Sequence, residues 1–281
     1  MIVFCYTATV DIAFAFDETY ADHARVALES ILDSRQHDDV TYWLLTTDQV
    51  AKEYERPLRR QLAGRGSLRL LTTGDAFRSL PVAEHEALAW LSPGMYLRLL
   101  LPELIGDGPA RLLYLDSDIH VCGDLSPLWQ VPLDGVPLAA VRDAFGDRFD
   151  AFGGIPGSGP EHPADAPYFN SGVMLMNLAH WRATQVTERC LDYLAANADR
   201  LRFPDQDALN LVAYQRWLRL PPRWNNMASF LLEPMDEAQR GEQDVRVMHF
   251  AGPRKPWTEG FRPGFRLQRH HTLAARVAAF G

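Results

Sequence analysis

Short apolar runs alternate with longer amphipathic segments along most of this chain of 281 residues. Such alternation is typical of an α/β fold with a mostly parallel sheet, because parallel strands are joined by helical crossovers. No internal repeat and no obvious linker interrupts the pattern. The predicted strands cover residues 12–16, 40–45, 68–71, 111–115, 137–141, 173–176 and 245–250.

The amphipathic segments between these runs predict the helices. An apolar stripe over residues 20–32 predicts the first one, with Thr19 and Asp22 placed as in a capping box. The Ser-Pro pair at 92–93 resembles an N-cap followed by proline at the first helical position, and Pro102 is expected to end that helix. Further helices are expected over residues 181–196 and 205–217.

Two carboxylates follow one of the most apolar runs. Residues 112–115 lead directly into Asp116-Ser117-Asp118. Side chains two apart on an extended segment share a face, so both carboxylates would project together from the end of the strand. Paired hard oxygens at such an end suit Mg²⁺ or Mn²⁺. Taken alone, the segment also fits a solvated turn after a strand.

A second polar group follows the last apolar run. That run carries His249, and Gly252 and Lys255 come shortly after it. The glycine allows close backbone approach, and a turn that offers backbone N–H groups and a lysine suits a diphosphate. A histidine nitrogen beside two carboxylates favours Mn²⁺ over Mg²⁺. A lone histidine at a strand end is otherwise more often a hydrogen-bonded structural residue.

Six motifs occur in a characteristic order. They are Ala15-Phe16-Asp17-Glu18-Thr19-Tyr20, Tyr96-Leu97-Arg98-Leu99, Tyr114-Leu115-Asp116-Ser117-Asp118, Phe169-Asn170-Ser171-Gly172-Val173, Asp205-Gln206-Asp207 and the segment from His249 to Trp257. In these motifs the chain resembles glycosyltransferase family 8, the retaining group that includes bacterial lipopolysaccharide galactosyl- and glucosyltransferases and glycogenin. The resemblance implies a Rossmann-like α/β domain of the GT-A type over residues 1–257 and a short basic extension over residues 258–281.

The resemblance also implies a metal site. Asp116, Asp118 and His249 match the family's metal ligands, which implies Mn²⁺ as the cofactor, with Mg²⁺ as the other candidate. The cation would bind the diphosphate of a UDP-sugar. Degenerate members of the family would be expected to lose a ligand, whereas all three positions are kept here together with Lys255. The resemblance therefore favours catalysis.

Further positions match the donor site of the family. They are Ala15, Asp17, Thr19, Arg98, Asp116, Ser117, Asp118, Asn170, Gly252 and Lys255. Asp17 and Thr19 match positions that contact uridine, although the family usually has asparagine where Thr19 stands; a helix cap is an equal alternative for Thr19. For Arg98 the alternative is a charge on a helix surface. Gly252 and Lys255 match the turn that binds the diphosphate.

Four further positions match residues that surround the transferred sugar in the family: Asp143, Asn170, Asp205 and Gln206. The resemblance implies retention at the anomeric carbon. Double displacement needs a carboxylate nucleophile beneath the sugar, but the matching position is Gln206, an amide. Front-side attack by the acceptor is therefore expected, with Asp143 or Asp205 as the alternative nucleophile. Asp205 also fits the N-cap of its helix.

The implied reaction moves glucose or galactose from UDP-glucose or UDP-galactose to a hydroxyl of a saccharide or glycoconjugate. A UDP-sugar hydrolase and a non-catalytic UDP-sugar-binding module are the alternatives. The acceptor is expected to be selected by loops. The longest is residues 146–167, rich in Gly, Pro and Asp, which has the length usually found in lids and substrate-contacting loops.

Composition limits the remaining classes of partner. A formal net charge of −8 argues against bulk nucleic-acid binding, because a phosphate backbone would be repelled. The three cysteines include no C-x-x-C pair, which argues against a zinc knuckle or a disulfide framework and predicts a reducing, cytoplasmic setting. No secretory signal or membrane-spanning run is expected either.

The stretch after Gly252 carries six basic side chains against one acidic residue. These are Arg254, Lys255, Arg262, Arg266, Arg269 and Arg276. A solvated basic helix that packs Leu267, Leu273 and Val277 on the domain is the favoured interpretation. Weak contact with an anionic membrane, on its inner face, is the alternative.

Overall fold

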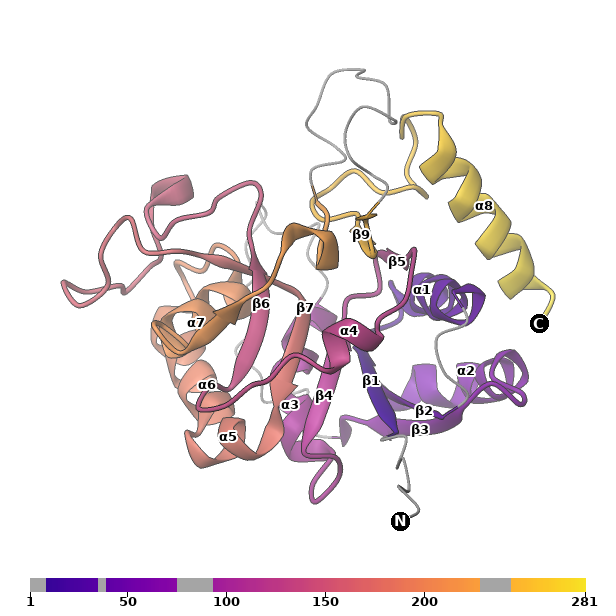
Figure 1. Cartoon of the computed structure of the whole chain (residues 1–281), viewed down its shortest axis with the longest axis horizontal. Coiled ribbons are helices and arrows are strands. Elements are labelled where there is room, and N and C mark those ends of the chain that lie inside the picture. The colour runs from indigo at the N-terminus through magenta and orange to yellow at the C-terminus, as the bar shows by residue number, and fades with distance from the viewer. Residues whose placement is uncertain (1–8, 35–38, 75–92, 228–243) are drawn as a thin grey trace, which may run out of the picture.

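The computed structural model describes residues 9–34, 39–74, 93–227 and 244–281. Within these ranges the large sheet has seven strands in the order β3-β2-β1-β4-β7-β6-β8, and a small sheet pairs β5 with β9 (Figure 1). The strands are β1 (Val10–Ala15), β2 (Val40–Thr46), β3 (Ser67–Thr72), β4 (Arg111–Leu115), β5 (Ile119–Val121), β6 (Leu138–Arg142), β7 (Phe169–Asn177), β8 (Trp217–Arg219) and β9 (Val247–His249).

Most pairs in the large sheet are parallel. The strands β3, β2, β1 and β4 run in one direction, and β6 and β8 share it. Only β7 runs against them, between β4 and β6. The expected mostly parallel α/β sheet is therefore confirmed, with β7 as its antiparallel member.

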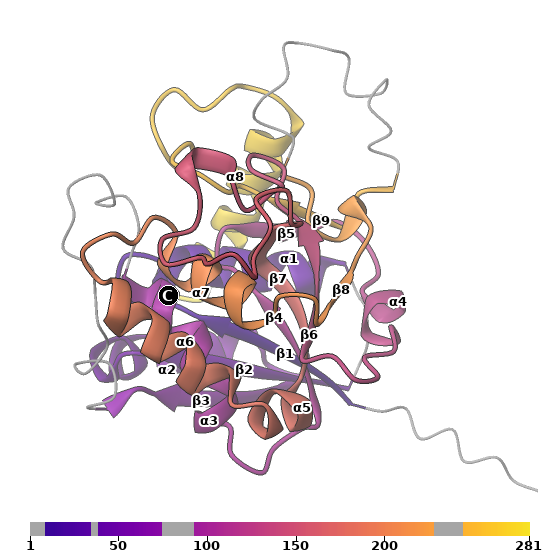
Figure 2. The same ribbon diagram turned by 90° about the vertical axis from the view of Figure 1, so that its left-hand side faces the viewer.

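Helices cover both faces of the sheet. They are α1 (Ala21–Asp33), α2 (Asp48–Gln61), α3 (Leu97–Leu104), α4 (Ser126–Trp129), α5 (Leu178–Ala183), α6 (Val186–Asn197), α7 (Pro204–Val212) and α8 (Phe265–Ala278), with 3₁₀ turns η3 (Pro93–Tyr96), η4 (Ala151–Gly153) and η5 (Pro222–Trp224). Phe14 on β1 and Leu113 on β4 belong to the layer under α1 and α2, whereas Ala13 and Tyr114 belong to the layer under α3, α5, α6 and α7. Figure 2 shows α6 in front of the sheet and α1 behind it. Burial on both faces explains why these strands are continuous apolar runs.

The start of the first helix differs from the prediction. The helix α1 begins at Ala21, Tyr20 occupies the cap position, and no side chain caps it. The Thr19 N–H instead donates to Asp17 Oδ1 at 3.0 Å. The capping alternative for Thr19 is therefore wrong, because a local turn built by Asp17 competes for the same backbone group.

Two expected helices are shorter than predicted. The segment 181–196 is divided between α5 and α6 at Gln185, whose φ of 53° is left-handed. The segment 205–217 leaves the helix after Val212, because Trp217 pairs with Leu138 in the sheet as the first residue of β8. Conversely, α3 continues through Pro102 to Leu104. Tertiary contacts outweighed local propensity in all three places.

The loop at 146–167 contributes to a small apolar cluster that is separate from the two layers of the main core. Phe149, Ile155, Ala166 and Tyr168 are buried together, and Tyr193 on α6 packs against them. The loop contains the 3₁₀ turn η4, whose Phe152 has a left-handed φ of 55° and is 59% exposed. This loop lies next to the pocket described below, which Phe152 lines.

The C-terminal helix α8 packs against α1, as the favoured interpretation expected. Leu273 and Val277 are buried in a cluster with Val26, whereas Leu267 is half-buried and lies outside that cluster. Arg269 and Arg276 both form ion pairs with Asp33 at the end of α1. Across the described ranges, the helices are all too short or too polar to cross a membrane.

Candidate functional site

A pocket of about 510 Å³ opens at one edge of the large sheet. The carboxyl ends of β1, β4 and β6 meet there, and β7 enters from the same edge because it runs antiparallel to its neighbours. Residues that follow or begin these strands therefore face one space. Most of the sequence-predicted site residues line it: Ala15, Arg98, Asp116, Ser117, Asp118, Asp143, Asn170, Asp205, Gln206, His249, Gly252 and Lys255.

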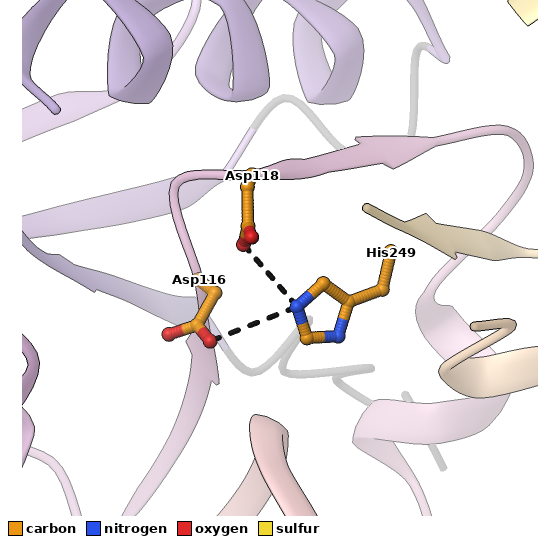
Figure 3. Close-up of side chains that lie close together, drawn as sticks. All are labelled: Asp116, Asp118 and His249. Atoms are coloured by element: carbon orange, nitrogen blue, oxygen red, sulfur yellow. Dashed lines mark ion pairs between the residues drawn. The ribbon is translucent and has the colours of Figure 1, made fainter. Parts of the chain in front are cut away.

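Three candidate metal ligands converge in this pocket. His249 Nε2 lies 3.2 Å from Asp118 Oδ1 and 3.8 Å from Asp116 Oδ2. Figure 3 shows one ring nitrogen of His249 directed at both carboxylates. One ligand atom from each residue lies within 4.8 Å of the other two. Two carboxylate oxygens and an imidazole nitrogen at this spacing suit a divalent cation such as Mn²⁺, so the residues fit the implied metal.

The small sheet explains how the distant histidine reaches the carboxylates. After Asp118 the chain forms β5, which pairs antiparallel with β9, and Ile119 lies opposite His249. The Phe250 N–H also donates to the Asp118 carbonyl at 2.9 Å. Backbone pairing thus fixes His249 beside Asp118.

Gly172 on β7 leaves the space that the three ligands need. A Cβ at this position would lie 2.3 Å from His249 Cε1 and 2.7 Å from Asp116 Oδ2. The Asp116 N–H donates to the Gly172 carbonyl at 2.8 Å, which holds the two backbones in place. Glycine is thus required at position 172, because His249 and Asp116 approach it too closely for a side chain to fit.

Lys255 places a cation next to the candidate metal ligands. Its ammonium group pairs with Asp118 Oδ2 and donates to the Phe250 carbonyl at 2.8 Å. Burial of Asp118 opposes ionisation, but Lys255 and His249 outweigh it and hold the pKa of the Asp118 carboxyl well below its usual range. The neighbouring Ser117 hydroxyl is buried and has no hydrogen-bond partner among the described residues.

Arg98 is buried between two carboxylates. It pairs with Asp116 at 2.9 Å and with Asp205 at 3.0 Å, and it donates to the Ser171 carbonyl at 3.1 Å. Burial alone would lower the pKa of Arg98, but Asp116 and Asp205 outweigh it and raise the pKa above its usual range. The alternative of a surface charge is wrong for Arg98, because the side chain is enclosed at the base of the pocket.

Asp205 lies in the first turn of α7 but does not cap it. Phe203 occupies the cap position, and its N–H donates to Asp207 Oδ2 at 3.2 Å, so the N-cap alternative for Asp205 is wrong. Its carboxylate turns to Arg98 and accepts from the Ser171 hydroxyl at 3.3 Å. Burial is the main reason that the pKa of Asp205 is raised; the charge of Asp116 adds to the shift and Arg98 opposes it.

Asp143 is held by hydrogen bonds from both of its sides. Its Oδ1 accepts the backbone N–H groups of Phe145 at 2.8 Å and Gly146 at 3.0 Å. Its Oδ2 accepts from Asn170 Nδ2 at 3.1 Å and from Gln206 Nε2 at 3.2 Å. The carboxylate is therefore fixed in orientation and joined to two residues predicted to surround the sugar.

Asp17 and Thr19 are the two predicted site residues outside the pocket lining. Asp17 is buried, and its Oδ2 accepts the Gly94 N–H at 3.1 Å. Thr19 is exposed. Their neighbours Phe16 and Tyr20 do line the pocket. Asp17 thus shapes the backbone on one side of the pocket, and contact of either residue with a nucleoside stays a prediction.

Several residues of the site were not predicted from the sequence. Four aromatic residues also line the pocket: Phe145, Phe152, Tyr168 and Phe203. No periodicity marks these aromatics, which come from loops and from the residue before α7. Asn225, buried behind His249, was also missed. It follows a short 3₁₀ turn in a segment without any pattern.

Comparisons with known proteins agree with this architecture. The model of the family described as "Glycosyl transferase family 8" matches residues 11–260. A lipopolysaccharide 1,2-glucosyltransferase of Escherichia coli K12 is 28% identical over 256 residues, which cover 88% of this chain and 72% of that protein. General stress protein A of Bacillus subtilis is 29% identical over 195 residues, 66% of each chain. A crystal structure of the galactosyltransferase LgtC with donor and acceptor sugar analogues matches with a TM-score of 0.77 and 27% identity, and it covers 95% of this chain and 96% of LgtC.

Proposed function

Because the chain belongs to glycosyl transferase family 8 and is a glycosyltransferase, we propose that it moves glucose or galactose, with retention, from a UDP-sugar to a hydroxyl of a saccharide or glycoconjugate. The observation that carries the proposal is the convergence of Asp116, Asp118 and His249 beside Lys255 in one pocket. The names of a glucosyltransferase and of a galactosyltransferase solved with sugar analogues support both donor candidates and a saccharide acceptor.

The diphosphate end of the donor would lie against the metal ligands. A bound Mn²⁺, or Mg²⁺ in its place, would supply a Lewis acid for the charge that develops on the leaving group. Lys255 contributes a fixed positive charge there without reorganisation during the reaction. Gly252 has a φ of 87°, which gives the turn between His249 and Lys255 a backbone path that is strained for other residues. The Ser117 hydroxyl, which no described residue engages in a hydrogen bond, can donate to an oxygen of the UDP-sugar.

The sugar would lie at the Asp143, Asp205 and Gln206 end of the pocket. Both carboxylates are already engaged, Asp143 by four hydrogen bonds and Asp205 by Arg98 and Ser171. This engagement supports front-side attack by the acceptor over a covalent intermediate. Mass spectrometry of a reaction quenched during turnover tests the mechanism, since a glycosyl adduct on Asp143 or Asp205 would overturn it.

The metal site has a direct test in Asp118→Asn. The amide keeps the shape of the side chain but removes the charge that a cation requires. We expect loss of Mn²⁺ binding and a fall of about two to three orders of magnitude in UDP-sugar turnover, with an unchanged circular dichroism spectrum. Near-normal turnover in the folded variant would refute the assignment.

The acceptor distinguishes transfer from the alternatives. With a panel of UDP-sugars and candidate saccharides, the transferase should form a glycosylated product as it releases UDP. Release of UDP without a glycosylated product, whichever acceptor is added, would instead identify a hydrolase. Binding of UDP-sugar with no turnover would identify a non-catalytic binding module.

We further propose a cytoplasmic enzyme that contacts a membrane surface weakly at most. Arg269 and Arg276 are already paired with Asp33, and α8 buries its apolar side chains on α1. The remaining exposed groups of the segment include Arg262 and Phe265. Co-sedimentation with anionic liposomes, compared between the intact chain and one truncated after Gly260, tests this; strong binding that depends on the segment would contradict it.

A further inference from the structure

Asn225 is a buried asparagine behind the candidate metal site, and both ends of its amide are used. It follows η5 and is only 1% exposed. Its Oδ1 lies 2.8 Å from His249 Nδ1, and its Nδ2 donates to Asn170 Oδ1 at 2.8 Å. The side chain thus stands between a candidate metal ligand and a residue at the sugar end of the pocket.

The directions of these hydrogen bonds follow from groups whose roles are fixed. The Gly172 backbone N–H is only a donor, and it bonds Asn170 Oδ1 at 3.0 Å. The Asp143 carboxylate accepts, and it faces Asn170 Nδ2 at 3.1 Å. Asn170 therefore presents its oxygen to Asn225, which must donate through Nδ2 and turn its own oxygen to His249. His249 then has to donate through Nδ1–H.

This chain of hydrogen bonds determines which ring nitrogen of His249 carries the proton. With the proton on Nδ1, the lone pair of Nε2 points toward Asp116 Oδ2 at 3.8 Å and Asp118 Oδ1 at 3.2 Å. Three electron-rich atoms then face one point, which is the arrangement that a cation stabilises. A proton on Nε2 would occupy that space instead.

We propose that Asn225 is a positioning residue that holds His249 in its metal-binding tautomer and links the metal ligands to the sugar end of the pocket. The inference rests on the proposed function, because the cation and the sugar are those of the UDP-sugar reaction. Its geometric basis is independent of that reaction, since it follows from the hydrogen bonds of Asn225 and Asn170.

The second half of the proposal concerns the link through Asn170. Asn170 Nδ2 and Gln206 Nε2 both donate to Asp143 Oδ2. Gln206 Oε1 in turn accepts the Ser171 N–H at 3.0 Å, which fixes the direction of its amide. Loss of the Asn225 donor would leave Asn170 without one of the two donors that hold its oxygen. Asn225 therefore determines both the orientation of the sugar-facing groups and the tautomer of the metal ligand His249.

Two substitutions separate the two halves. Asn225→Leu removes both hydrogen bonds, and we expect the Mn²⁺ affinity to fall about 10–100-fold, as is usual when the partner of a ligating histidine is lost. Asn225→Asp keeps an acceptor for His249 Nδ1 but removes the donor to Asn170. We expect Asn225→Asp to keep its Mn²⁺ affinity within about threefold of the parent while its UDP-sugar turnover falls at least about tenfold.

Asn197 provides the matched control. It is also a buried asparagine with both ends of its amide bonded, to the Tyr193 carbonyl and to Arg200, but it does not line the pocket. Asn197→Leu and Asn197→Asp should keep Mn²⁺ affinity and turnover near those of the parent. Mn²⁺ affinity is measured by electron paramagnetic resonance of the free ion, and folding by circular dichroism.

A direct readout of the tautomer requires neither metal nor activity. Imidazole ¹⁵N shifts in the metal-free protein, assigned to His249 by comparison with His249→Gln, should report a proton on Nδ1. An Nδ1 without a proton in the parent overturns the proposal, as does an equal loss of Mn²⁺ affinity in Asn225→Leu and Asn225→Asp. If Asn225→Leu does not fold, the imidazole ¹⁵N shifts of the parent protein still test the proposal, as do the Mn²⁺ affinity and the turnover of Asn225→Asp. A parent with the Nδ1–H tautomer that binds no Mn²⁺ would instead refute the proposed function.

Discussion

Gly172 stands where a larger residue would enter the space between two candidate ligands. We expect Gly172→Ala to reduce the Mn²⁺ affinity and the turnover about tenfold or more, because its Cβ would meet His249 and Asp116. Metal titration of the folded variant checks this. Val173→Ala is the control, since the neighbouring buried side chain faces the opposite apolar layer. If Gly172→Ala binds Mn²⁺ as the parent does, the ligands have room that the structure does not show.

Single residues also show where sequence reasoning succeeded and where it could not. Asp116 and Asp118 were predicted because an apolar strand must deliver the residues after it to the edge of the sheet. Asn225 follows no strand, and its role depends on a partner far away in sequence and on the direction of one amide. Only the folded chain brings such a residue to His249.

At the scale of elements, the long apolar strands were predictable and the short ones were not. The strands β1, β2 and β4 are buried on both faces, so their sequences are continuous apolar runs. The strand β8 consists of Trp217, Leu218 and Arg219, and its pairing with β6 defines it. The break between α5 and α6 likewise depends on tertiary contact, because the Thr187 hydroxyl after the break donates to the Leu99 carbonyl on α3 at 2.8 Å. These contacts cannot be predicted from the local sequence pattern.

The docking of α8 on α1 should depend on pH. Burial is the main reason that the pKa of His270 on α8 is lowered to about 4, and burial together with the charge of His270 lowers the pKa of His23 on α1 to about 4. Both histidines thus bind a proton more weakly in the folded protein than in the unfolded chain. The unfolded chain takes up more protons between about pH 6.5 and 4, so stability falls as pH drops through this window.

Thermal melts across this window test the pH dependence. We expect the Tm of the metal-free protein to fall by a few degrees from about pH 6.5 to 4, and His270→Gln to show a shallower slope. His180→Gln, on α5 and away from α8, should keep the slope of the parent. An unchanged slope in His270→Gln would show that α8 docking does not contribute to the acid sensitivity.

For the whole molecule, metal binding should raise stability. A cation that binds only the folded protein stabilises it by about 2.7 kcal/mol at a concentration 100 times its Kd. We therefore expect Mn²⁺ to raise the Tm by about 5 °C or more, and EDTA to reverse the change. Asp118→Asn should show no shift. A parent whose Tm is the same with Mn²⁺ and with EDTA would contradict a metal site of this affinity.

The small sheet of β5 and β9 joins chain segments that are made at very different times. Lys255 and Asp118 are 137 residues apart in sequence, and His249 reaches the same place only through β9. During synthesis on the ribosome, β1 and β4 can pair long before these residues have emerged. A nascent or prematurely terminated chain could thus have much of its sheet and still lack a ligand and the lysine. The candidate metal site would therefore form only after His249 and Lys255 have emerged, later than most of the large sheet.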